Sequence, residues 1–336
     1  MSLNIIPKVQ SVTEYKGRRV LKENEIEFIK DEGFLPETYE IEITKDKAII
    51  KYKTEKGKFY ALNTLSQITD EKGSVPLLKI TDFPRFPYRG FMIDSARHMQ
   101  TVDEIKTYIE AASMFKFNYF HWHLCDDQGV RFECEAYPLL NEIGSYRNGH
   151  GFGSKNEERY GGFYTKDEIK DVIEFCKERH IEVIPEVDIP GHTVAMLASY
   201  PELSCKGEKI EVETTPGIHK DIMCAGKEST YEFCFGVLSE IIELFPCEYI
   251  HIGGDEAPKV RWNKCPHCQK KIKEEGLNNA EELQGYFTQR MVDFVESKGK
   301  KAIVWNESLN SGMLPKNVTV ADWLDKQHKS EPFANE

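Results

Sequence analysis

The sequence predicts an α/β protein: a TIM-type (β/α) barrel that is C-terminally incomplete and is preceded by a small α+β domain. Residues 1–84 combine alternating strand patterns with one amphipathic helix, whereas residues 85–336 repeat a cycle of apolar strand, loop and amphipathic helix. In this second part nearly every strand candidate ends in a carboxylate. A barrel gathers such strand ends around one mouth, while an open doubly wound sheet spreads them along a line, so the barrel is the better explanation.

The first domain is expected to be a sheet with a helix packed on it. The segments YEIEI and KAIIKYK alternate apolar and polar residues, and Lys45-Asp46 between them supplies a turn, so we expect a β-hairpin. The segment YALNTLSQI then carries apolar residues at helical spacing: Ala61, Leu62, Leu65 and Ile68. The two prolines of DFPRFPYR mark the linker into the second domain.

The second domain has six strand candidates: GFMID, NYFHWHL, EVIPEVD, EYIHIGG, KAIVWNE and TVADWL. Three helices between them are predicted to open with a Ser/Thr-x-x-Glu capping box, at Thr101 with Glu104, Thr165 with Glu168, and Ser229 with Glu232. Behind the second box, one helical face is apolar at Ile169, Val172, Ile173 and Cys176.

Composition and charge narrow the function classes. The 336 residues are 40% hydrophobic and 30% charged with a net charge of −12, which is typical of a soluble globular protein and argues against nucleic acid or an anionic membrane as partner. No stretch approaches the run of about 18 apolar residues that a membrane span needs, and MSLNIIPKVQ lacks a secretory signal. We therefore expect a cytoplasmic protein, or a secreted one if a signal peptide was removed.

The strongest chemical signal is HIGGDEAP. Its two glycines let the backbone turn sharply at a strand end, where Asp255 and Glu256 present adjacent carboxylates. When their surroundings separate the pKa values of two such acids, one serves as general acid while the other stays ionised. A solvated Asp-Glu pair is the commoner case for an arbitrary loop, but the position between a buried strand and Ala-Pro favours catalysis here.

Histidines accompany the other acids. The segment EVDIPGH places Asp188 at a strand end and His192 after a Pro-Gly turn, where an imidazole can hydrogen-bond a carboxylate and tune it. The segment HWHLCDDQG adds His121, His123, Asp126 and Asp127. Such a set is compatible with a bound metal ion and also with a hydrogen-bonded network in a sugar pocket. The network is favoured, so no metal and no cofactor are expected there.

Two further features suit a sugar ligand. The segment RGFMIDSARH offers Arg89, Asp94 and Arg97 as donors and acceptors for vicinal hydroxyls. Trp305 and Trp323 follow late strand candidates, where indole faces can stack on an apolar sugar or acyl face. A lone tryptophan is more often part of the core, but these two share their position with the acids.

Seven segments occur in order over nearly the whole chain: RGFMIDSARH, NYFHWHLCDDQG, IPEVDIPGH, CAGKESTYEF, FPCEYIHIGGDEAP, LQGYF and IVWNE. Together they resemble the glycoside hydrolase family 20 β-N-acetylhexosaminidases, and residues 1–84 are similar to the small α/β domain that precedes the family barrel. The resemblance implies removal of terminal N-acetylglucosamine or N-acetylgalactosamine from a glycan or small molecule, with retention of configuration. The substrate's acetamido oxygen would be the nucleophile.

The resemblance also implies roles for individual residues. Glu256 matches the general acid/base, and Asp255 matches the residue that orients the acetamido N–H and stabilises the oxazolinium-like intermediate. His192, with Asp126 or Asp127, matches the relay that tunes the acid. Arg89 matches the clamp on ring hydroxyls. The remaining substrate-binding candidates are Trp305 and Trp323 as walls of the acetamido pocket, with Asp94, His123, Asp188, His251 and Glu307.

The sequence departs from the family in its strand count. The family barrel has eight strands, and six candidates precede Glu336. We therefore expect either a fragment of a longer enzyme or a chain that forms a homo-oligomer. A catalytically inactive fragment or sugar-binding homologue is the alternative, and a metal-dependent hydrolase that uses His121, His123 and Asp126 is a third interpretation.

The nine cysteines do not suggest a disulfide framework, because their number is odd and they are scattered through apolar segments. Cys265 and Cys268 have the spacing of a metal knuckle, which Cys247 and Cys224 could complete. A single Cys-x-x-Cys without a second pair is a weak signal, so packing at a helix start is favoured over metal binding.

Overall fold

The structure of the protein is a computed structural model that describes residues 3–149 and 158–323. The chain forms two compact units. The first comprises Met1–Phe91, Asp103–Tyr119 and Phe175–Glu182, and the second comprises Met92–Val102, Phe120–Glu174 and Val183–Glu336.

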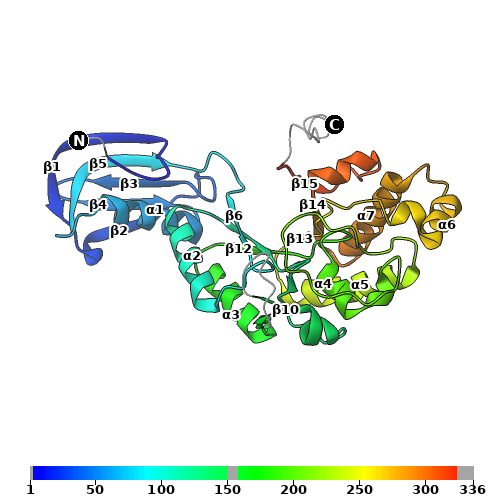
Figure 1. Cartoon of the computed structure of the whole chain (residues 1–336). Helices are drawn as coiled ribbons and strands as arrows, with labels where there is room; N and C mark the ends of the chain where they lie inside the picture. The colour runs from blue at the N-terminus through cyan, green and yellow to red at the C-terminus, as the bar shows by residue number, and fades with distance from the viewer. Residues whose placement is uncertain (1–2, 150–157, 324–336) are drawn as a thin grey trace. The chain divides into compact units, whose positions relative to one another are not determined.

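The first unit holds a five-stranded sheet in the order β1-β5-β3-β4-β2 (Figure 1). The strands are β1 Ser11–Val20, β2 Ile26–Lys30, β3 Tyr39–Ile43, β4 Ala48–Tyr52 and β5 Ser74–Asp82. β3 and β4 are antiparallel with Ile43 opposite Ala48, so the predicted hairpin is confirmed. β2 pairs with β4 in parallel.

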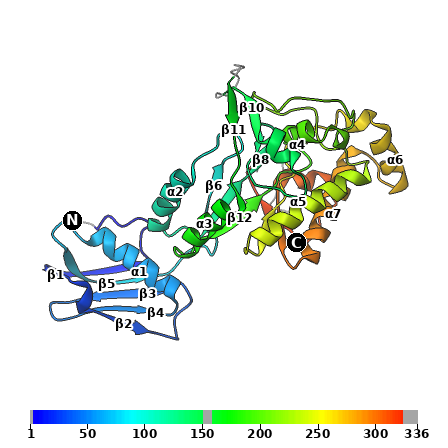
Figure 2. The same cartoon turned by 90° about the horizontal axis from the view of Figure 1, so that it is seen from below.

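Helix α1, Glu55–Ile68, lies along one face of this sheet (Figures 1 and 2). It begins before the predicted segment because Thr54 is its N-cap and accepts a hydrogen bond from the Gly57 N–H at 3.4 Å. Ala61, Leu65 and Ile68 are buried against the strands as expected. Leu62 is 38% exposed, because one residue of helix turns its side chain about 100° away from that of Ala61.

The second unit holds a six-stranded sheet in the order β15-β14-β13-β12-β7-β6. The strands are β6 Gly90–Asp94, β7 Tyr119–His123, β12 Glu182–Glu186, β13 Tyr249–His251, β14 Lys301–Trp305 and β15 Thr319–Ala321. The pairings from β12 to β15 are parallel. Spatial order follows chain order, as in a barrel and unlike a doubly wound sheet. The predicted incomplete barrel is confirmed, with β6 and β15 at the two ends of the described sheet.

The α-helices that follow α1 in the described part of the chain are α2 Val102–Met114, α3 Lys166–Lys177, α4 Val194–Ser199, α5 Glu228–Leu244, α6 Pro266–Glu274 and α7 Ala280–Ser297. Helices α5 and α7 lie side by side in both views, where Phe235 and Phe294 stack with ring centroids 4.5 Å apart (Figures 1 and 2). On α3, Ile169, Val172 and Cys176 are fully buried, as predicted. The remaining short strands and helical turns are β8 Cys125–Asp126, β9 Gly129–Val130, β10 Tyr146–Asn148, β11 Arg159–Gly161, η1 Glu23–Glu25, η2 Leu140–Gly144, η3 Pro201–Leu203, η4 Trp262–Lys264 and η5 Asn306–Ser311.

One predicted capping box is confirmed and one is wrong. Before α3, the Thr165 Oγ1 accepts the Glu168 N–H at 3.2 Å, and the Glu168 carboxylate accepts the Thr165 N–H at 2.8 Å. Ser229 lies inside α5, whose N-cap is Lys227 and whose first residue is Glu228. The pattern at Ser229 is therefore a coincidence of spacing within a helix.

No helix in the described part of the chain is both long and apolar enough to cross a membrane.

Candidate active site

The strand-end acids of the second unit meet at the carboxyl edge of its sheet. Asp94 ends β6, Asp126 follows β7 and Glu186 ends β12. The turn after β13 carries Asp255 and Glu256. Parallel strands place their carboxyl ends at one edge, so acids from distant parts of the sequence become neighbours.

Glu186 is the centre of this cluster, and the sequence analysis did not single it out. Its side chain is fully buried, and Oε2 lies 2.8 Å from Nε2 of His121 and also contacts Nδ1 of His123. Its Oε1 accepts a hydrogen bond from the Trp305 Nε1–H at 2.7 Å and lies 3.3 Å from Nδ1 of His251. The sequence does contain a signal for its role, namely an acid inside the otherwise apolar strand VIPEV. Burial of an acid costs free energy unless the acid is paired.

His123 connects Glu186 to a second acid, Asp126. Its Nε2 lies 2.8 Å from Oδ2 of Asp126, which also receives Nη2 of Arg97 at 2.7 Å. Nη1 of Arg97 binds Oδ2 of Asp94 at 2.9 Å. Burial opposes a charged ring, but the facing Glu186 and Asp126 carboxylates outweigh it and raise the pKa of His123 well above its usual value.

His192 contacts three carboxylates, whereas the EVDIPGH motif predicted that its imidazole would contact one. Its Nδ1 lies 3.1 Å from Oδ1 of Asp126 and 3.2 Å from Oδ2 of Asp127, and its Nε2 lies 3.3 Å from Oε2 of Glu256. Burial disfavours the imidazolium, yet these carboxylates together raise the pKa of His192. The nearby His192 ring in turn lowers the pKa of Glu256.

The turn after β13 has the tight geometry that HIGGDEAP predicted. Gly253 and Gly254 have φ values of 66° and 103°, and a Cβ on Gly253 would lie 1.7 Å from Oδ1 of Asp188. The Gly254 N–H donates to that same oxygen at 3.0 Å. Glu256 has a φ of 40°, a strained conformation for a non-glycine residue, of a kind that clusters at active sites, switch regions and ligand clamps.

Asp255 keeps one acceptor free for a ligand. Its Oδ1 is buried and has no hydrogen-bond partner among the residues that the structure describes. Burial raises the pKa of Asp255, and burial together with the charge of Asp255 raises the pKa of Asp188 well above its usual value. A buried acceptor without a partner requires an explanation, and a donor on a bound substrate provides one.

Residues after β14 border the same turn. Oε2 of Glu307 accepts the Glu256 N–H at 3.2 Å, and burial together with the charge of Asp255 raises the pKa of Glu307 to about 7. The Trp305 ring lies 4.6 Å from the His251 ring and 6.2 Å from the Trp323 ring. Trp323 is 49% exposed, so its indole face is accessible to a ligand.

Comparison with known families identifies the scaffold. The model "Glycosyl hydrolase family 20, catalytic domain" matches residues 86–336, and "Glycosyl hydrolase family 20, domain 2" matches residues 8–83. The chain belongs to glycosyl hydrolase family 20. The resemblance drawn from the seven motifs is thereby confirmed.

Family 20 relatives with curated names support this assignment. A β-hexosaminidase of Porphyromonas gingivalis is 39% identical over 305 residues, which cover 88% of this chain and 38% of that protein. A β-hexosaminidase of Vibrio furnissii is 36% identical over 308 residues, which cover 88% of this chain and 49% of that protein. The chain thus spans less than half the length of these two relatives.

Solved family 20 structures share the fold. A β-N-acetylhexosaminidase from Bacteroides fragilis matches 97% of this chain and 71% of its own with a TM-score of 0.86 and 35% identity. An exo β-N-acetylglucosaminidase from Vibrio harveyi, in complex with N-acetylglucosamine, matches 96% of this chain and 58% of its own with a TM-score of 0.86 and 30% identity.

Arg89 does not occupy the position that the family resemblance implied. It immediately precedes β6, so a five-residue strand that rises about 3.3 Å per residue separates it from the carboxyl edge. Its guanidinium donates to Oε2 of Glu37 at 2.6 Å, the Tyr60 hydroxyl at 3.0 Å and the Lys116 carbonyl at 2.8 Å. Arg97 of the same motif stands beside Asp94 instead. The assignment of Arg89 to ring hydroxyls is therefore wrong.

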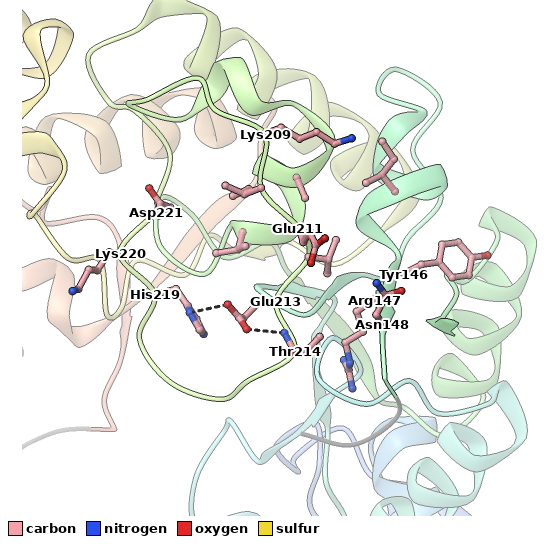
Figure 3. Close-up of a pocket in the computed structure, with 15 residues that line it drawn as sticks. Tyr146, Arg147, Asn148, Lys209, Glu211, Glu213, Thr214, His219, Lys220 and Asp221 are labelled. Carbon is pink, nitrogen blue, oxygen red and sulfur yellow. Dashed lines mark hydrogen bonds and ion pairs between the residues drawn. The ribbon is translucent and has the colours of Figure 1, made fainter. Parts of the chain in front are cut away.

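Two pockets of this family 20 chain adjoin the acid cluster. One of about 290 Å³ is lined in part by Glu256, Lys259 and Glu307. A larger one of about 910 Å³ is shown in Figure 3, where Glu213 binds His219 at 3.2 Å and the Thr214 N–H at 2.8 Å. The Glu213 N–H donates to the Asp127 carbonyl at 3.0 Å, which joins the larger pocket to the cluster.

Some residues of the cluster could in principle hold a metal ion. The ligand atoms of Asp126, Asp127 and His192 lie within 4.8 Å of one another, as do those of His121, Glu186 and His251. In the first set the imidazole already faces both carboxylates, and in the second Glu186 is shared by two rings and the Trp305 indole. These paired contacts favour the hydrogen-bonded network over a metal centre, and the absence of a metal here stays a prediction.

Proposed function

We propose that the protein is an exo-acting, retaining β-N-acetylhexosaminidase that removes terminal β-linked N-acetylglucosamine or N-acetylgalactosamine by substrate-assisted catalysis. The observation that carries the proposal is the buried Oδ1 of Asp255, which has no hydrogen-bond partner among the described residues and lies next in sequence to Glu256. Glu256 contacts His192, and His192 also contacts two further acids. Family membership and the names of the relatives agree with it.

In the first step the acetamido carbonyl oxygen of the substrate attacks the anomeric carbon as the glycosidic C–O bond breaks. Glu256 gives its proton to the leaving oxygen. Oδ1 of Asp255 accepts the acetamido N–H and stabilises the positive charge that develops on the oxazolinium ring. The protein needs no nucleophile, because the substrate supplies one.

In the second step water attacks the anomeric carbon and reopens the ring, and Glu256 takes a proton from that water. Two displacements at one carbon retain its configuration. Without substrate the shared proton resides on His192, since the pKa of His192 is raised and that of Glu256 is lowered. A sugar bound over Glu256 removes water from its carboxylate, which raises the pKa of Glu256 and draws this proton onto it.

The remaining site residues hold the sugar. Arg97 is 29% exposed at its side chain, so donors beyond those used by Asp94 and Asp126 can reach ring hydroxyls. The Trp305 indole, fixed by its hydrogen bond to Glu186, and the Trp323 indole form walls for the apolar faces of the sugar and its acetyl group.

The test is hydrolysis of a chromogenic β-N-acetylglucosaminide by the chain, by Glu256→Gln and by Glu274→Gln, an identical change at an exposed residue of α6. We expect Glu256→Gln to lose at least about a hundredfold in kcat and Glu274→Gln to match the unchanged chain. Equal rates for all three would overturn the assignment of Glu256.

A catalytically inactive sugar-binding protein is the second candidate, because the described sheet has six strands rather than the eight of a closed barrel. It predicts that N-acetylglucosamine binds to the folded chain while neither the unchanged chain nor any variant hydrolyses the chromogenic substrate. A metal-dependent hydrolase would instead lose activity in a chelator while its circular dichroism spectrum stays the same.

A further inference from the structure

Four cysteines of the second unit meet in one place. The Sγ atoms of Cys205, Cys224, Cys265 and Cys268 all lie within 4.8 Å of one another. Cys224 lies 3.7 Å from Cys265 and 3.6 Å from Cys268, and Cys205 lies 3.8 Å from Cys268. We call this set the four-cysteine cluster. Cys247, which the sequence analysis considered as a member, precedes β13, where its sulfur accepts the Tyr249 N–H at 3.4 Å.

The spacing of the sulfurs fits a tetrahedral metal ion. A zinc–thiolate bond is about 2.3 Å long, so the sulfurs of a Zn(Cys)₄ site are about 3.8 Å apart. Three of the six sulfur pairs of the cluster lie between 3.6 and 3.8 Å apart. A disulfide would bring two sulfurs to about 2.05 Å. Packing alone does not require four thiols to share one point, and the other five cysteines lie outside the cluster.

The backbone builds the cluster from two pairs that face each other. Cys265 is the N-cap of α6 and Cys268 lies in its first turn, so both sulfurs point to one side of the helix start. Ser204 forms an antiparallel bridge with Met223, and the Cys224 N–H donates to the Leu203 carbonyl at 2.8 Å, which brings together the two segments that carry Cys205 and Cys224. A Cβ on Gly226 would lie 2.2 Å from the backbone of His267, so the chain after Cys224 passes against the start of α6 without room for a side chain.

We propose that the four-cysteine cluster is a structural zinc site. Four protein thiolates leave no open coordination position, as is typical of structural and not of catalytic zinc. Iron also accepts a tetrahedral set of four sulfurs, but zinc has no redox chemistry and suits a site whose role is to fasten two segments. The proposal stands on the four sulfurs alone and is independent of the proposed hydrolase activity.

The zinc would fasten the segment that follows the catalytic turn. Residues 201–227 supply two ligands, and residues 261–275, which follow Asp255 and Glu256, supply the other two. The same two segments are joined by the Arg261 to Asp221 ion pair at 2.9 Å and by the Trp262 indole N–H, which donates to the Met223 carbonyl at 2.8 Å. The metal is therefore expected to hold the backbone after Glu256 without touching substrate.

The first experiment measures the metal content of the purified chain by mass spectrometry after expression with added zinc and purification without chelator. We expect one zinc per chain in the unchanged protein and in Cys247→Ala, a matched change at a buried cysteine outside the cluster. The double variant Cys265→Ser with Cys268→Ser should retain less than a tenth of that zinc. Unchanged protein that is metal-free, or that carries iron instead of zinc, overturns the proposal.

A second experiment needs no variant to fold. Modification of the native chain with a thiol reagent should release one zinc as four thiols react, and the chelated, reduced chain should take up one Zn²⁺ or one Co²⁺ with the visible absorption of tetrahedral cobalt–thiolate. The melting temperature should fall on chelation and recover with Zn²⁺ but not with Mg²⁺. Peptide mapping that finds these cysteines in two disulfides, or a reduced chain that takes up no Zn²⁺, contradicts the site.

Discussion

His123 and His192 lower the pKa values of carboxylates that they face, those of Asp126, Glu186 and Glu256. His123 stands between Glu186 and Asp126, and His192 stands between Asp126 and Glu256. Burial raises the pKa of an unpaired acid, yet the pKa of Glu186 is well below its usual value because three imidazoles surround it. Asp188 faces no such excess of positive charge, and its pKa is raised. Burial alone therefore does not decide which acids hold a proton.

The His192–Glu256 pair predicts a specific pH dependence. Together the two groups keep one proton until His192 loses it, and the pKa of His192 is raised, so the pair can still supply the leaving group at neutral pH. In His192→Asn, Glu256 must hold that proton by itself. We expect the alkaline limb of the kcat/KM profile to move to lower pH, with activity kept at acidic pH and lost near neutrality. An alkaline limb at the same pH in both proteins would contradict this role.

Glu307 predicts a pH-dependent cost to stability. Its pKa is about 7 in the folded chain against 4.5 as the reference value, so the folded state favours the protonated form. The stability that the folded state gains by holding Glu307 protonated is fully present below pH 4.5 and is lost as the pH rises through about 7. Glu307→Gln should therefore melt at a higher temperature than the unchanged chain at pH 8 and at the same temperature at pH 4.5. A lower melting temperature of the variant at pH 8 would contradict this account.

The sequence predicted which residues meet but not how their side chains pair. Asp94, Asp126 and Asp255 follow strands, and parallel strands bring such residues to one edge whatever the side-chain packing. Glu186 was missed because Asp188, two residues later, was taken as the strand end. Arg89 was assigned from the family resemblance although it precedes the strand GFMID, whereas Arg97 follows that strand and so reaches the carboxyl edge.

At the scale of single elements, all six strands of the second sheet were predicted because each is a largely apolar segment between turns, whereas β1, β2 and β5 of the first sheet were not predicted. The carboxyl end of GFMID was placed correctly, and those of the other five were placed one to three residues too late. KAIVWNE ends as a strand at Trp305, where the backbone enters the helical turn Asn306–Ser311. The carboxylates at such strand ends form hydrogen bonds within the site and not along the sheet. Hydrophobic periodicity contains no information on that change.

The two Ser/Thr-x-x-Glu patterns that differ in structure give a matched stability test. Thr165 caps α3 through the reciprocal bonds with Glu168, so Thr165→Ala should cost about 1 kcal/mol of unfolding free energy. Ser229 is an exposed residue inside α5, and Ser229→Ala should change stability by less than about 0.5 kcal/mol. Urea unfolding of both variants decides the matter. Equal losses would show that the Thr165 cap contributes nothing of its own.

At the scale of the whole molecule, the two units are stabilised in different ways. The first has the five-stranded sheet, helix α1, nearly all of helix α2 and a buried ion pair, Lys116 with Asp82 at 2.8 Å, to which the Tyr39 hydroxyl is also bound. The second contains the acid–histidine cluster at the carboxyl edge of its sheet and also the four-cysteine cluster. The four tryptophans of the chain, Trp122, Trp262, Trp305 and Trp323, all belong to the second unit. Tryptophan fluorescence therefore reports on that unit, and circular dichroism reports on both.

This distribution makes the independence of the units measurable. Lys116→Met leaves Asp82 charged and unpaired in a buried position, which should cost about 3–5 kcal/mol in the first unit. We expect urea to unfold this variant in two steps, with an earlier transition in circular dichroism and an unchanged midpoint in tryptophan fluorescence, because each unit has its own core. Lys79→Met is the control, since the Lys79 side chain is 42% exposed and its ion pair with Glu40 contributes less than about 1 kcal/mol. A fluorescence midpoint that falls together with the dichroism midpoint in Lys116→Met would show instead that the two units unfold as one.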